Sequence, residues 1–109
     1  MRQFYTVILD RMTEVKGTLA SEPYECGWAG EALAFVRIHS LENGQTVRGK
    51  IQVSVDGITW LDEGTDFKDM KKAGDYFVKV REFGGWLRLV LEGVEDTSYK
   101  VTTSLVLKE

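Results

Sequence analysis

Histidine and cysteine, two residue types that often take part in nucleophilic catalysis, occur once each in this chain. His39 is the only histidine and Cys26 is the only cysteine. An activated nucleophile needs a base within hydrogen-bond reach, and such pairs are recognised by family-specific settings such as a nucleophile elbow. Neither residue lies in such a setting, and no glycine-rich loop has the spacing that cradles a phosphate. The sequence therefore predicts a protein that is not an enzyme, in which Cys26 is a small buried hydrophobe.

Oxygen ligands for a cation are concentrated in one polar stretch, which holds Asp56, Asp62, Glu63, Asp66 and Asp69. An EF-hand calcium loop places its ligands at fixed offsets, and the spacing here does not follow that pattern. A single cysteine also excludes a multi-cysteine zinc site and an internal disulfide. We predict a solvated loop and no metal or cofactor, and leave open whether the 62–69 segment binds a cation.

Aromatic side chains can either stack on sugar rings or anchor a hydrophobic core. Of the three tryptophans, Trp60 follows a turn signal and Trp86 opens a strand pattern, so we expect both to bury large apolar areas. Trp28 lies in a glycine-containing loop near Tyr24 and is the best candidate for an exposed contact. Carbohydrate therefore remains a candidate ligand.

The length and charge of the chain narrow its class. A chain of 109 residues and 12.4 kDa is expected to form one domain, residues 1–109, with a single core. The net charge is −3, and lysine and arginine are scattered. Because nucleic acids and anionic membranes attract basic stripes, neither is an expected partner. We also predict no secretory signal and no membrane span, since the apolar runs are short.

The segment 51–60, IQVSVDGITW, has the pattern of a β-hairpin. Ile51, Val53 and Val55 alternate with polar residues, and Asp56-Gly57 is favoured in two-residue turns with positive φ. We therefore predict a tight hairpin whose return strand begins at Ile58. Comparable patterns predict strands at 4–12, which we place near a sheet edge, and at 17–19, 24–26, 32–41, 76–81, 86–92 and 99–108, with turns at Asn43-Gly44 and Gly84-Gly85. The polar segment 61–72 is the other place where a helical turn could form.

Strands at this spacing, separated by glycine, aspartate or asparagine, predict an all-β antiparallel β-sandwich of jelly-roll type with about six to eight strands. The 32–41 segment is apolar on both faces, which suits a central strand covered by a second layer or by a subunit neighbour. The predicted core consists of Leu33, Phe35, Ile51, Val53, Val55, Trp60, Val78, Val80, Leu87, Leu89, Leu91, Val101 and Leu105.

Three motifs, followed by the alternating terminal strand, resemble the β-sandwich proteins encoded among the structural genes of tailed phages and prophages. They are VSVDGITW with Ser54, Asp56, Gly57 and Trp60, AGDYFVKV with Gly74 and Tyr76, and GGWLRLVLEG with Gly85, Trp86, Leu87, Arg88 and Leu89. The resemblance covers roughly residues 30–108. A similar sequence pattern occurs in discoidin-like and other carbohydrate-binding sandwiches. The bridging cysteines of discoidin domains are missing in this chain.

The resemblance implies a non-catalytic structural or assembly protein of a phage-like particle, such as a capsid decoration or virion accessory subunit. It would act in the virion, or in the host cytoplasm during assembly, on virion proteins and on copies of itself. The alternative is a carbohydrate-binding module. Phe77 and Val106 fall on the outward sides of their strands, and contiguous exposed apolar patches mark interfaces. With Trp28 and Tyr24 they are the predicted contact residues.

Overall fold

The computed structural model describes residues 4–42, 44–81, 83 and 85–109. Strands dominate this part of the chain, and its one helix is a single 3-10 turn. In chain order the elements are β1 (Phe4–Lys16), β2 (Thr18–Ala20), β3 (Tyr24–Glu25), β4 (Glu31–Leu41), β5 (Val47–Ser54), β6 (Leu61–Asp66), β7 (Gly74–Arg81), β8 (Trp86–Gly93), η1 (Val94–Asp96) and β9 (Ser98–Lys108). No described helix is long and apolar enough to cross a bilayer.

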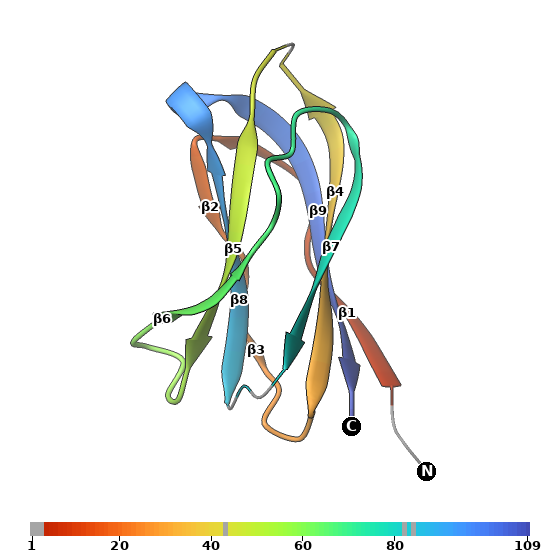
Figure 1. The fold of residues 1–109 in the computed structure, drawn as a ribbon, viewed down its shortest axis with the longest axis vertical. Coiled ribbons are helices and arrows are strands. Elements are labelled where there is room, and N and C mark those ends of the chain that lie inside the picture. The colour runs from red at the N-terminus through yellow and green to blue at the C-terminus, as the bar shows by residue number, and fades with distance from the viewer. Residues whose placement is uncertain (1–3, 43, 82, 84) are drawn as a thin grey trace.

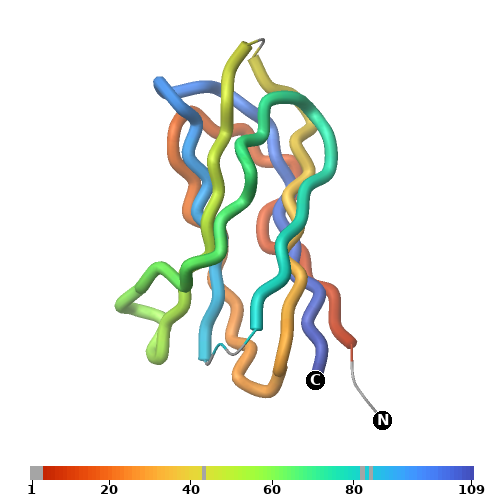
Figure 2. Tube along the Cα trace, in the orientation of Figure 1, coloured from red at the N-terminus to blue at the C-terminus, as the bar shows by residue number. Residues whose placement is uncertain are grey.

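The strands form two antiparallel sheets packed face to face (Figure 1). One sheet has the order β1-β9-β4-β7 and is called the β4 sheet below. The other, the β8 sheet, has the order β2-β8-β5-β6, with β3 also paired to β8. The chain passes repeatedly from one sheet to the other, as the trace in Figure 2 shows, and the first strand pairs with the last. The predicted all-β antiparallel sandwich is confirmed, and two of the described strands are very short.

The core lies between the sheets and is lined by alternate residues of each strand, as period-2 geometry requires. The predicted pattern of the last two long strands is confirmed. Leu87, Leu89 and Leu91 of β8 are buried, as are Val101 and Leu105 of β9.

In β4 the prediction chose the wrong face. Ala32, Ala34, Val36 and Ile38 are buried, whereas Leu33 and Phe35 lie on the opposite, outer face and are only partly buried. Alternation shows that a strand has two faces but cannot show which one meets the second sheet. The small alanines let the layers approach closely, and the larger side chains are left outside.

The prediction of a tight hairpin at Asp56-Gly57 was also wrong. β5 ends at Ser54 and β6 begins at Leu61, so a six-residue connection, 55–60, replaces the two-residue turn. Val55 consequently leaves the strand pattern and is 92% exposed, and Trp60 lies outside any strand and is only partly buried. Neither belongs to the buried core, although Val53 and Val78 pack against it.

The 61–72 segment contributes to the core where a helical turn was considered. Its first half is strand β6, and Met70 then forms a bridge with Val47. Phe67 and Met70 are buried, and neither was predicted. A Cβ atom on Gly49 would lie 2.9 Å from Cδ1 of Phe67, so a glycine at this point of β5 makes room for the ring. Of the two predicted glycine turns, Asn43 and Gly84 lie outside the described residues.

Candidate protein-binding face

The outer face of the β4 sheet carries a strip of apolar side chains across all of its strands. One row of directly paired residues runs Ile8, Ser104, Phe35 and Phe77, from β1 through β9 and β4 to β7. The adjacent row runs Thr6, Val106, Leu33 and Lys79. The apolar members of these rows, Ile8, Leu33, Phe35, Phe77 and Val106, are called the outer strip below.

Two aromatic rings form the β7 end of the outer strip. Phe35 and Phe77 are opposite each other on β4 and β7, and their rings stack with centroids 5.6 Å apart. Phe77 is 55% exposed and Ile8 is 43% exposed. Side chains of this kind, left in contact with water on a sheet face, provide the area that a protein partner can bury.

Charged pairs border the outer strip on both sides along the strands. Arg37 Nε lies 2.6 Å from Asp75 Oδ1 beyond one side, and Arg81 Nε lies 3.6 Å from Glu31 Oε2 beyond the other. The hydrogen bond from Arg37 holds the pKa of Asp75 below its usual value. An apolar centre with a polar, charged rim is the usual anatomy of a protein–protein interface.

The structure brings the predicted contact residues together as two pairs. Phe77 and Val106 both lie on the outer strip, with Val106 partly exposed. Ile8 belongs to the same strip and was missed, although its place on β1 opposite Ser104 follows from the alternation of an edge strand.

Trp28 and Tyr24 form part of a separate aromatic groove, together with Phe4 and Tyr5. These four residues line a shallow cavity of about 440 Å³ beside the first residues of β1. The rings of Tyr5 and Tyr24 stack with centroids 6.1 Å apart, and Trp28 is 41% exposed. Partial burial and then the neighbouring Tyr5 phenol raise the pKa of Tyr24. Phe4 and Tyr5 were not predicted as contact residues.

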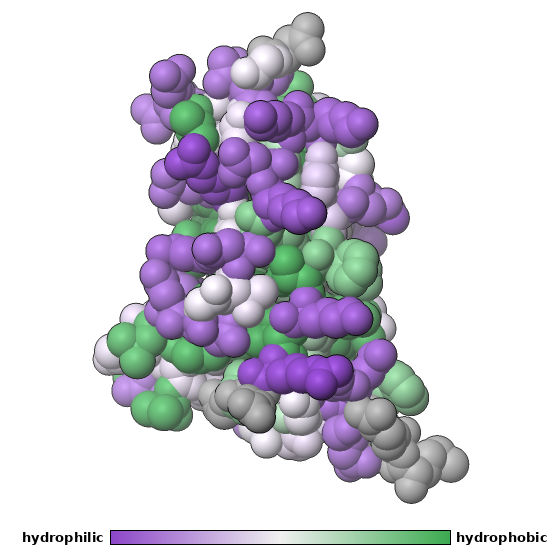
Figure 3. Space-filling model, in the orientation of Figure 1, coloured by the Kyte–Doolittle hydropathy of each residue, from purple (hydrophilic) through white to green (hydrophobic). Residues whose placement is uncertain are grey.

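A third exposed apolar group, called the apolar loop below, consists of Val55, Ile58 and Leu61 at the β5–β6 connection. Ile58 is 81% exposed and Leu61 is 67% exposed. Figure 3 shows hydrophobic side chains protruding there, at the lower left of the view. Sequence reasoning missed this group because it treated Val55 as a core residue.

Side-chain hydrogen bonds give the apolar loop a defined shape. Asp56 Oδ1 accepts from the Ile58 N–H at 2.8 Å and from the Thr59 N–H at 3.0 Å. Ser54 Oγ accepts from the Gly57 N–H at 2.8 Å and donates to Asp56 Oδ1. The bonds from Thr59, Ile58 and Ser54 lower the pKa of Asp56. The Ser54 and Asp56 of the sequence motif are therefore loop-forming residues.

The residues considered for chemistry have structural partners. His39 Nε2 lies 2.8 Å from Thr102 Oγ1 on the neighbouring strand. Cys26 is fully buried, and burial raises the pKa of its thiol to about 12. Asp62 binds Lys50 and Gln52, and Asp69 lies 3.6 Å from Arg48. Within the described ranges, no three histidine, cysteine or acidic residues are grouped so that they could hold a metal ion.

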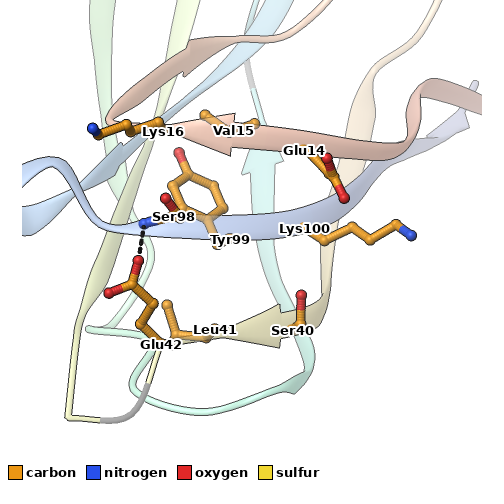
Figure 4. A pocket seen from close by; sticks show the side chains of 9 residues that line it. All are labelled: Glu14, Val15, Lys16, Ser40, Leu41, Glu42, Ser98, Tyr99 and Lys100. Carbon is orange, nitrogen blue, oxygen red and sulfur yellow. Dashed lines mark hydrogen bonds between the residues drawn. The ribbon is translucent and has the colours of Figure 1, made fainter.

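A larger cavity of about 630 Å³ lies at the end of the β4 sheet where β1 and β4 end and β9 begins (Figure 4). Its walls carry charges of both signs, from Glu14, Lys16, Glu42 and Lys100. The Tyr99 hydroxyl donates to the Gly17 carbonyl, and Glu42 accepts from the Ser98 N–H at 3.3 Å. We see no convergent set of groups in it that would activate a substrate.

Comparison with known proteins identifies relatives in fold. No protein-family model matches the chain, and no curated protein matches it in sequence. Among solved structures, the SPBc2 prophage-derived protein YomS is similar with a TM-score of 0.65 and 9% identity, over 100% of this chain and 96% of that one. The infectious bursal disease virus VP2 subviral particle is similar with a TM-score of 0.59 and 12% identity, over 98% of this chain and 32% of that one.

At these identities the likeness shows a shared fold. This protein has a β-sandwich of the kind found in a prophage-derived protein and in the VP2 protein of a viral particle. It matches nearly the whole of YomS, but only about a third of the VP2 chain.

Proposed function

We propose that this protein is a non-catalytic structural subunit of a phage or virus particle, and that it contacts other particle proteins through the outer strip. The observation that carries the proposal is the row Ile8–Ser104–Phe35–Phe77, which crosses the whole sheet face and leaves a stacked pair of aromatic rings exposed toward its β7 edge. The fold relatives support it, because they come from a prophage and from a capsid. The protein would act in the virion, or in the host cytoplasm while particles assemble.

The energetics favour Phe77 as the dominant contact. Burying an exposed phenylalanine fully contributes about 1.5–3 kcal/mol, and a few residues, often aromatic ones, carry most of the binding energy of an interface. The Phe77 ring also stacks on the neighbouring Phe35 ring, so little side-chain freedom is lost when a partner covers it.

The test is co-sedimentation of the purified protein with particles assembled from the shell and tail proteins encoded beside its gene. Phe77→Asp should weaken pelleting by about tenfold or more, because it buries a charge within the contact. Val55→Asp is the matched control, since it places the same charge at a more exposed apolar residue outside the outer strip. Both variants should keep the β-sheet circular dichroism spectrum.

The result that would overturn the proposal is wild-type protein that never pellets with any such particle. If Phe77→Asp and the wild type pelleted equally, the outer strip would not be the contact surface. If Val55→Asp alone abolished pelleting, the contact surface would be the apolar loop.

The aromatic groove favours a second candidate function, binding of carbohydrate. Tyr5, Tyr24 and Trp28 offer ring faces of the kind on which sugars stack. A glycan array should then give a positive signal that Trp28→Ala abolishes and Phe77→Asp leaves intact. An array without any signal would leave the groove as a protein surface.

A further inference from the structure

The strand β1 has one edge that no described strand covers. It is the outermost strand of the β4 sheet, and β9 is its one partner among the described strands. Figure 1 shows its first half beyond β9, on the side away from β4. An uncovered edge presents a row of backbone N–H and C=O groups that can pair with another strand.

Only the first part of β1 is regular enough to accept a partner strand. The register with β9 is continuous from Phe4 to Ile8 and then shifts between Ile8 and Asp10 and again between Asp10 and Thr13. Met12 has a φ of 47°, which twists the second half of the strand away from regular pairing. The usable edge is therefore the segment 4–8.

The remaining edges carry features that discourage pairing. β2 and β3 contain three and two residues. β6 carries Asp62, Glu63 and Asp66, and its Gly64 has a φ of 111°. β7 presents Asp75, Lys79 and Arg81 as exposed charges. Short strands, charges and irregular backbone are the usual protection of sheet edges, and the segment 4–8 has none of them.

The segment 4–8, FYTVI, is also self-complementary. Antiparallel pairing of two copies about Thr6 places Phe4 opposite Ile8 on the outer face and Tyr5 opposite Val7 on the inner face. Aromatic and β-branched residues form favourable cross-strand pairs, and no like charges would meet within the segment. Phe4, Tyr5 and Ile8 are 64%, 50% and 43% exposed, so their apolar surface is available for burial.

We infer that a second copy of this chain pairs with the edge of β1, with Thr6 facing Thr6 of the partner subunit. The two four-stranded β4 sheets then become one sheet of eight strands across a two-fold axis. The outer strips of both copies, which include Ile8, lie on the same side of that sheet and are joined into one surface.

The contact is small, because a strand edge of five residues buries less than the roughly 800 Å² per partner of a standard interface. The dimer should therefore depend on concentration, and in a particle many copies held close together would favour it. The inference does not rest on particle binding, since β1 pairing needs only the protein itself.

Sedimentation equilibrium over a range of protein concentrations tests the inference. The wild type should dimerise. Thr6→Glu and Thr6→Lys should each weaken dimerisation by about tenfold, because each places two like charges directly opposite across the axis. An equimolar mixture of the two variants should recover a heterodimer, since the charges are then opposite in sign. Thr6 is exposed, so both replacements should leave the monomer folded.

Lys79→Glu is the matched control. Lys79 ends the same cross-strand row as Thr6, at the β7 edge, so its charge reversal should leave dimerisation unchanged. Hydrogen exchange adds a second measurement, because the outward N–H groups of the segment 4–8 should become protected as protein concentration rises.

Three results would overturn the inference: a wild type that stays monomeric at millimolar concentration, a dimer that Thr6→Glu does not weaken, or variants whose mixture gives no heterodimer. Phe77→Asp should leave the dimer intact, so loss of particle binding and loss of dimerisation are separately observable.

Discussion

Cys26 shows how burial decides the chemistry of a single side chain. The residue follows β3, is 0% exposed, and belongs to the core between the sheets. Its surroundings disfavour the thiolate, first through burial and then through the nearby Glu25 carboxylate, and the pKa of the thiol rises from 9.0 to about 12. Because the thiolate is the reactive form, this cysteine is inert in the folded protein. The sequence prediction of a buried hydrophobe is confirmed.

We predict that Cys26 does not react with Ellman's reagent at pH 8 in the native protein within minutes. In guanidinium chloride it should react stoichiometrically and at once, which is the internal control. Rapid reaction of the native protein would contradict the burial of Cys26.

The same pKa shift predicts a dependence of stability on alkaline pH. The folded-state pKa is raised, so the stability that the protonated thiol contributes is complete below the unfolded value near 9 and is lost as pH rises toward about 12. Denaturant midpoints measured between pH 8 and pH 11 should fall, and Cys26→Ser should reduce the fall.

At the scale of elements, the β5–β6 connection shows that hydrogen bonds to a side chain can outweigh the preference of Asp-Gly for a two-residue turn. Asp56-Gly57 is a strong hairpin signal, but the Asp56 carboxylate accepts the N–H groups of Ile58 and Thr59, and Ser54 accepts that of Gly57. These bonds satisfy backbone N–H groups of a loop that is wider than a two-residue turn. A Cβ atom on Gly57 would lie 3.1 Å from the Trp86 ring. The apolar loop is consequently ordered although its side chains are exposed.

We predict that Asp56→Ala loosens this loop without unfolding the sandwich. The amides of Ile58 and Thr59 should lose hydrogen-exchange protection, while the denaturant midpoint changes little because Asp56 is exposed.

The lowered pKa of Asp56 also predicts how the hydrogen bonds of this loop depend on pH. The bonds are complete above the ordinary carboxyl value of about 4 and should be lost as pH falls through the lower folded value. Protection that survives in Asp56→Ala would contradict this account.

The positions of the strands could largely be predicted from the sequence, whereas the side of each strand that faces the core could be predicted only in part. In β9 the alternation of large apolar with polar residues leaves one choice of face, and the choice was right. In β4 both faces are apolar, so alternation alone did not select the inner one, which carries Ala32 and Ala34. Phe67 and Met70 were hidden by the polar residues around them in the sequence, although both are buried.

The positions of the predicted contact residues could be foreseen to a similar degree, whereas their role in binding stays a prediction. Outward positions of Phe77 and Val106 follow from strand alternation, and the structure places both on the outer strip. That Phe35 stacks on Phe77 depends on the pairing of β4 with β7, which lie far apart in the sequence. Sequence alone does not give strand order, so it could not show that these residues adjoin.

For the whole molecule, Gly17 is the point where the chain leaves one sheet for the other, between β1 and β2. It has a φ of 84° and is buried. Its carbonyl accepts from the Gly93 N–H and the Tyr99 hydroxyl, each at 2.8 Å, and its N–H donates to the Thr97 carbonyl at 3.1 Å. The β1–β2 junction is therefore bonded to the end of β8, to the start of β9 and to the residue just before β9.

We predict that Gly17→Ala lowers the free energy of unfolding by about 1–3 kcal/mol, because a non-glycine residue is strained at positive φ. Its Cβ atom would also lie 3.2 Å from Asp96 Oδ1. Gly30→Ala is the control, since the nearest atom to its Cβ would be 3.7 Å away and its φ is not positive. Chemical denaturation should separate the two variants. Equal midpoints would show that the crossing tolerates a side chain.

The pairing of the first strand with the last also determines how the molecule responds to mechanical force. β1 and β9 are antiparallel, with Phe4 beside Lys108 at one end of their ladder and Lys16 beside Ser98 at the other. Tension between the Phe4 and Lys108 positions acts on one end of the ladder and opens its backbone hydrogen bonds in sequence, as a zipper opens. Tension between Phe4 and Ser98 acts along the strands and loads all of those bonds at once. The same sandwich is therefore soft to one direction of pull and stiff to the other.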